Sequence, residues 1–114
     1  MEINQEIKSV FHTDKYIGFV LLNKNKSGYE ARLYNKSGKQ VMNKAFTGEY
    51  SNVKMHKDEI IMYDGTKCCI ITNNGIMRFK GDLQTNALEV IPARGINRYL
   101  VMSADELRVV YLVK

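Results

Sequence analysis

Short apolar and β-branched runs alternate with polar turn sequences along the whole chain, and helical periodicity is almost absent. The clearest example lies between residues 50 and 82, where four such runs are separated by three tight turns. Asp64-Gly65 and Asn74-Gly75 supply two of these turns, because Gly and Asn tolerate the left-handed conformation that a hairpin requires. The pattern predicts a four-stranded antiparallel unit over residues 50–82.

The same order of strands and turns recurs on both sides of this unit. Residues 8–46 contain a similar unit upstream, and residues 88–113 contain one downstream that stops one strand short. The valines of the three first strands, Val10, Val53 and Val90, recur at intervals of 43 and 37 residues. A period near 40 with four strands per unit is typical of β-propeller blades, each of which stacks on a neighbour to hide its faces.

We therefore expect one all-β domain over residues 1–114, built from about three propeller-blade-like antiparallel units that form a partial propeller. The alternative architecture is a single β-barrel or a sandwich. Pro92 cannot donate to a strand ladder, so it should lie at a strand end or a sheet edge. No apolar run approaches the roughly 20 residues that span a membrane, and the compartment is left open.

The sequence contains no motif that carries chemistry. Gly-rich phosphate loops, nucleophile triads and calcium-loop spacings are missing. Cys68 and Cys69 are adjacent, so on a strand they point to opposite faces and are expected to be small buried apolar residues rather than a disulfide. The two histidines fall in predicted turns of different units, which does not predict a metal site. We expect neither catalytic residues, nor a metal, nor a cofactor.

The net charge of +5 arises mostly in the first unit, where residues 1–46 contain eight basic and four acidic residues. The candidate binding residues there lie in or beside loops: Lys24, Lys26, Lys36, Lys39 and Lys44. Together they predict a positive rim that attracts phosphates, acidic sugars or an anionic membrane. Lysines without interleaved arginine and aromatic residues do not predict nucleic-acid binding, and an ordinary solvated surface is the alternative.

A second candidate site is built from turns. The first turns of the three units contain polar residues at equivalent positions, namely His12, Asp14, His56, Asp58 and Arg94. Turns on one side of stacked blades converge, so these residues predict, as an alternative, a small-ligand receptor or an enzyme site made of blade-top loops.

The sequence YNKSGKQVMNKAF, residues 34–46, resembles the outer hairpin of quinoprotein-type β-propellers. The lack of tryptophan and the presence of Asn35 where an aspartate is usual argue against quinone chemistry. Together with residues 51–81, the segment also resembles a family of uncharacterised Gram-positive bacterial proteins with an N-terminal membrane anchor and an exported propeller-like domain. Only the C-terminal part of such a protein is matched. The resemblance implies a scaffold on the extracellular face of the membrane and no catalytic residues.

Three stacked sheets do not close into a ring, so the first and last sheets should each leave an apolar face without a neighbour. Either the chain is part of a larger propeller, or two copies pair their open faces as a homodimer. We expect pairing. The predicted function is that of a non-enzymatic binding or assembly module that engages a protein or a cell-envelope polymer.

Overall fold

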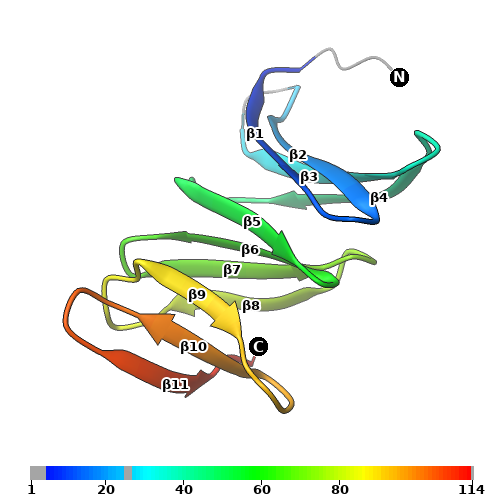
Figure 1. Ribbon diagram of the computed structural model, residues 1–114. Coiled ribbons are helices and arrows are strands. Elements are labelled where there is room, and N and C mark those ends of the chain that lie inside the picture. The colour runs from blue at the N-terminus through cyan, green and yellow to red at the C-terminus, as the bar shows by residue number, and fades with distance from the viewer. Residues whose placement is uncertain (1–4, 25–26, 114) are drawn as a thin grey trace.

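Three antiparallel β-sheets follow one another along the chain in the computed structural model, which describes residues 5–24 and 27–113 (Figure 1). The first sheet contains β1 (Ile7–His12), β2 (Tyr16–Leu22), β3 (Tyr29–Asn35) and β4 (Gln40–Phe46). The middle sheet contains β5 (Asn52–His56), β6 (Glu59–Asp64), β7 (Lys67–Thr72) and β8 (Met77–Asp82). The last sheet contains β9 (Glu89–Pro92), β10 (Arg98–Met102) and β11 (Leu107–Tyr111). Strands that are consecutive in the sequence are neighbours in each sheet.

The predicted all-β fold of about three blade-like antiparallel units is confirmed. The sheets begin and end close to the predicted boundaries, and the last sheet is one strand short, as expected. Pro92 ends β9, which is an edge strand. The alternative of a single barrel or a two-sheet sandwich is wrong, because the described residues form three separate sheets in a stack.

Apolar side chains on both faces of the middle sheet join it to its two neighbours. Ile60 of β6 belongs to a buried cluster with Leu33 of the first sheet. The next residue, Ile61, belongs to a second buried cluster with Val101 of the last sheet. Because successive residues of a strand point to opposite faces, one strand supplies both clusters. The middle sheet is therefore the central layer of the stack.

The three sheets are oriented alike. Figure 1 shows the first strand of each sheet, β1, β5 and β9, on the near side of the stack, and the turns that follow these strands on the right. β1 and β5 are in contact. Consecutive four-stranded units with this common orientation are consistent with partial propeller-like units.

Polar side chains at the sheet ends fix how the sheets stack. The Tyr99 hydroxyl of β10 donates to the Glu59 carboxylate of β6, 2.8 and 2.9 Å from its two oxygens. Arg78 Nε pairs with Glu59 Oε2 at 2.9 Å. Between the first and middle sheets, Asn73 Nδ2 donates to the Tyr16 hydroxyl oxygen at 3.1 Å. The Arg78–Glu59 pair lies within the middle sheet, whereas the Tyr99–Glu59 and Asn73–Tyr16 bonds join different sheets and, being directional, favour one alignment of them.

Replacing Ile60 or Ile61 with alanine is expected to lower the free energy of unfolding by about 2–5 kcal/mol in each case, because each change leaves a cavity in a close-packed cluster. Urea unfolding followed by circular dichroism at a fixed protein concentration measures this. Ile96 in the β9–β10 turn is 82% exposed, so Ile96→Ala should change the unfolding free energy by less than about 0.5 kcal/mol. A small effect at either Ile60 or Ile61 would contradict a middle sheet that is covered on both faces.

Candidate functional site

The predicted lysines do not form one rim. Lys24 follows β2, whereas Lys36 and Lys39 lie in the turn between β3 and β4. These two connections are at opposite ends of β3, about 20 Å apart for a seven-residue strand. Lys44 lies within β4 rather than in a loop, paired with Ala31, and Lys26 lies outside the described residues. The expectation of a single positive rim is corrected by this topology.

The five turn residues are on the same side of the stack, yet only two of them share a hollow. Asp14 and Asp58 line one hollow together with the lysines that adjoin them. His12 lines a separate hollow beside Tyr16. His56 and Arg94 do not line the hollow of Asp14, and the turn of Arg94 belongs to the last sheet, beyond the middle one. The structure therefore does not gather all five side chains into one site.

No group of three His, Cys, Asp or Glu side chains suited to a metal ion occurs within residues 5–24 and 27–113. Over the same ranges, no helix is long and apolar enough to cross a membrane.

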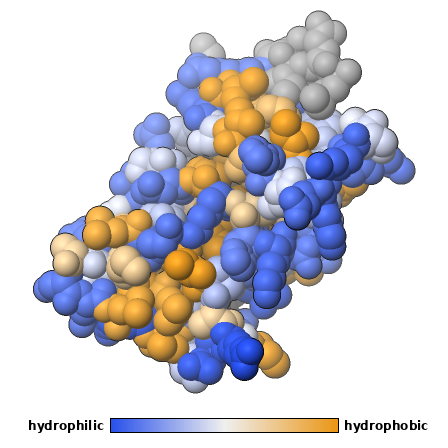
Figure 2. Space-filling view, in the orientation of Figure 1, coloured by the Kyte–Doolittle hydropathy of each residue, from blue (hydrophilic) through white to orange (hydrophobic). Residues whose placement is uncertain are grey.

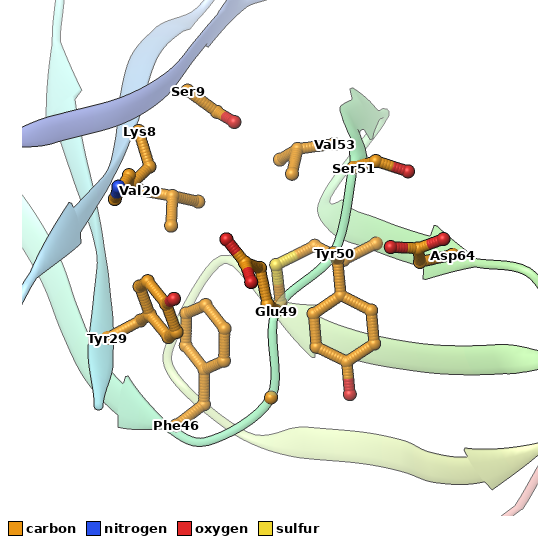
Figure 3. Close-up of a pocket in the computed structure, with 12 residues that line it drawn as sticks. Lys8, Ser9, Val20, Tyr29, Phe46, Glu49, Tyr50, Ser51, Val53 and Asp64 are labelled. Atoms are coloured by element: carbon orange, nitrogen blue, oxygen red, sulfur yellow. The ribbon is translucent and has the colours of Figure 1, made fainter. Parts of the chain in front are cut away.

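A cavity of about 240 Å³ opens between the first and middle sheets, where β4 leads into β5 (Figure 3). Its apolar lining includes Val20, Val53 and Met62. Three aromatic rings line it as well. The Phe46 ring lies 5.9 Å from the Tyr29 ring at an interplanar angle of 25°, and 6.2 Å from the Tyr50 ring. The cavity thus combines an apolar floor with aromatic walls, as ligand pockets do.

The charged side chains of this cavity are Lys8, Glu49 and Asp64. Lys8 Nζ pairs with Glu6 Oε2 at 2.7 Å, and this hydrogen bond raises the pKa of Lys8. Figure 3 shows Glu49 in the middle of the group, with its carboxylate directed toward the side of Tyr29 and Val20. In the described part of the chain, neither Glu49 nor Asp64 accepts a side-chain hydrogen bond or forms an ion pair. Lys8 also interacts electrostatically with Glu49, and with one cation and two carboxylates the lining has a net negative charge.

The outer face of the last sheet is largely apolar, with Arg98 and Glu89 at its ends, and has no covering element within the described residues. Strand pairing places six apolar side chains on this face: Ile91, Leu100, Met102, Leu107, Val109 and Tyr111. Tyr111 is 68% exposed and Leu107 is 59% exposed. Figure 2 shows hydrophobic residues gathered over the part of the molecule where β9, β10 and β11 lie. Contiguous apolar patches of this kind mark interaction sites in soluble proteins.

The outer face of the first sheet differs, because polar side chains lie over part of it. Phe19, Leu21 and Tyr34 are buried there. Beside them, Gln5 Nε2 and Arg32 Nη2 both donate to Glu30 Oε1, at 2.5 and 2.6 Å. Partial burial raises the pKa of Glu30, but the hydrogen bonds from Gln5 and Arg32 outweigh it and hold the pKa below its ordinary value.

The sequence predicts the uncovered face of the last sheet but not the cavity between the first and middle sheets. The face has a local signal, since Leu107, Val109 and Tyr111 alternate with a period of two residues. The cavity is lined by residues from both sheets and from the link between them. No local pattern in the sequence brings such residues together.

The two cysteines face opposite sheets, as predicted, and both are free and buried. Burial raises the pKa of Cys68 to about 12 and that of Cys69 to about 11. The thiolate, which is the reactive form, is therefore scarce near neutral pH.

A family described as "Family of unknown function (DUF5711)" matches residues 1–112. Comparison with curated proteins and with solved structures gives no significant match. The matched family is of unknown function, as expected from the resemblance to an uncharacterised family.

In the folded protein at pH 8, alkylation of Cys68 and Cys69 by iodoacetamide is expected to be at least about a hundredfold slower than in urea, because both thiols are buried and protonated. Mass spectrometry of timed samples measures the rate. A small model thiol in the same urea concentration controls for the effect of urea on the reagent. Rapid labelling of either cysteine without urea would contradict their burial between sheets.

Proposed function

The chain belongs to the DUF5711 family of unknown function, and we propose that it is a non-enzymatic assembly module that pairs with a second copy of itself through the outer face of its last sheet. The observation that supports this proposal is the set of six apolar side chains on that face.

The way in which the chain covers its other apolar faces supports sheet-on-sheet contact. Both faces of the middle sheet are covered by neighbouring sheets. The uncovered face offers the same kinds of residue, mainly aliphatic side chains with one tyrosine, as the covered ones. Apolar area removed from water contributes roughly 25 cal/mol per Å², so a second sheet on this face is favourable.

A second copy suits the middle of this face, because its charged residues lie at its ends, where Arg98 is opposite Tyr111 and Glu89 is opposite Met102. Two copies related by a twofold axis bring identical surfaces together, and like charges would then oppose each other. Leu107 and Val109 are uncharged, so bringing two copies of them together causes no charge repulsion. A twofold contact also closes on itself, so it gives a dimer and not a filament.

The first sheet is a poorer partner for this contact. Its outer face contains the Glu30 and Arg32 pair, whose side chains are only 14% and 15% exposed. Covering this pair with an apolar sheet would remove its remaining water without replacing the hydrogen bonds. Pairing of last sheet with last sheet is therefore favoured over last sheet with first sheet.

The family resemblance drawn from the sequence adds a setting to this proposal. It suggests a propeller-like scaffold on the extracellular face of a membrane-anchored bacterial protein. The paired scaffold would there engage a protein or a cell-envelope polymer. Within a longer chain, a further blade-like unit would take the place of the second copy on the same face.

Leu107→Glu is expected to weaken pairing by about tenfold or more, because it buries a carboxylate without a partner in the contact. Light scattering of the eluting species at tens of micromolar measures the mass, which should be that of a dimer for the unaltered chain and of a monomer for the variant.

Ile76→Glu is the matched control. Ile76 is also 59% exposed, but it precedes β8 in the middle sheet, away from the proposed contact. This variant should remain dimeric. A monomeric unaltered chain, or equal loss of mass in both variants, would overturn the proposal. Val10→Glu changes the outer face of the first sheet. A monomeric Val10→Glu variant beside a dimeric Leu107→Glu variant would show that the contact uses the first sheet instead.

A further inference from the structure

We propose that the cavity between the first and middle sheets binds a small organic ammonium ion through the carboxylates of Glu49 and Asp64 and the rings of Tyr29, Phe46 and Tyr50. The cavity has no residue from the last sheet. The proposal therefore goes beyond the assembly function and does not depend on it.

The charge of the cavity selects a cation. Lys8 has its own partner in Glu6, 2.7 Å away. Glu49 and Asp64 have no hydrogen-bonded or ion-paired side chain among the described residues. The lining contains two carboxylates and one cationic side chain, Lys8, which also interacts electrostatically with Glu49, so its net charge is negative and attracts a positive ligand. An anionic ligand would be repelled.

The aromatic rings favour an ammonium group over a metal ion. The faces of aromatic rings are electron-rich, and they attract ammonium groups that lie within about 6 Å of the ring centroid. Lys67 Nζ already lies 6.0 Å from the centroid of the Tyr50 ring. The Tyr50 ring, which lines the cavity, thus already has one ammonium group of the chain, that of Lys67, near its face. A metal ion would instead require a set of oxygen or nitrogen ligands without apolar walls.

The size and the floor of the cavity determine the rest of the ligand. A volume of about 240 Å³ is below the roughly 300–1,000 Å³ of drug-sized pockets. It suits a short aliphatic chain that ends in the ammonium group. Val20, Val53 and Met62 offer apolar contacts to such a chain. A lysine side chain and a small free amine both have this chemistry.

The direct test is an NMR titration of the ¹⁵N-labelled chain with n-butylammonium chloride, and with n-butanol and sodium butyrate as neutral and anionic compounds of similar length. Saturable shifts should appear at the amides of residues 48–51 and 62–64. The expected dissociation constant for butylammonium is on the order of 1 mM, as weak cation–π and ion-pair contacts provide. Butanol should bind at least about fivefold more weakly, and butyrate should not bind.

Glu49→Gln should weaken butylammonium binding by roughly three- to tenfold, since it removes one exposed charge. Asp64→Asn should act in the same direction. Glu106→Gln is the matched control, because it removes the same charge from an exposed turn before β11 in the last sheet. It should leave the affinity unchanged. The amide spectrum of each variant shows whether it is folded.

A second ligand distinguishes the two sources of the ammonium group. Nα-acetyl-lysine methylamide presents a lysine side chain as a peptide does. Tighter binding of this compound supports the proposal with a lysine of a polypeptide or polymer as ligand, and tighter binding of butylammonium supports it with a free amine. Equal binding of butanol and butylammonium, no shifts at the cavity, or equal effects of Glu49→Gln and Glu106→Gln would overturn it.

Discussion

A sheet that is apolar on both faces has to be covered twice, and the middle sheet imposes this requirement on the whole chain. Ile60 and Ile61, like Cys68 and Cys69, are consecutive residues that are fully buried on opposite faces. A single neighbouring sheet would leave one member of each pair in water. The first and last sheets therefore each pack one face against the middle sheet, and the hydrogen bonds of Glu59 with Tyr99 and of Asn73 with Tyr16 favour one alignment.

The two outer faces of the stack differ in the side chains that they expose. On the first sheet, Glu30 and Arg32 bond to each other beside the buried Leu21. Such a pair is costly to cover further, which makes this face a suitable end of the stack. On the last sheet, Leu107 and Val109 remain exposed, and their cross-strand partners are the apolar Met102 and Leu100. The stack thus has a polar patch at one end and an exposed apolar face, on which another sheet can pack, at the other end.

The sequence predicted the fold well because its signals are local. Gly65 and Gly75 have positive φ values of 58° and 85° in their turns, as their hairpins require. The valine spacing located the first strand of every sheet. The lysine rim failed because a loop's position depends on which strands pair: Lys24 and Lys36 are close in sequence but at opposite ends of β3. The turn residues failed in part for a related reason, because the middle sheet separates the turn of Arg94 from that of Asp14.

The cavity could not be predicted because it results from how two sheets meet, and neither sheet contains it alone. Tyr29 begins β3 and Phe46 ends β4, so antiparallel pairing brings their rings together at one end of the first sheet. Glu49 and Tyr50 lie in the link that must cross from that end to β5. A short link at this point leaves the carboxylate of Glu49 beside the aromatic pair (Figure 3). The apolar face of the last sheet lies on the other side of the middle sheet. Each of the two surfaces can therefore be occupied without any residue of the other.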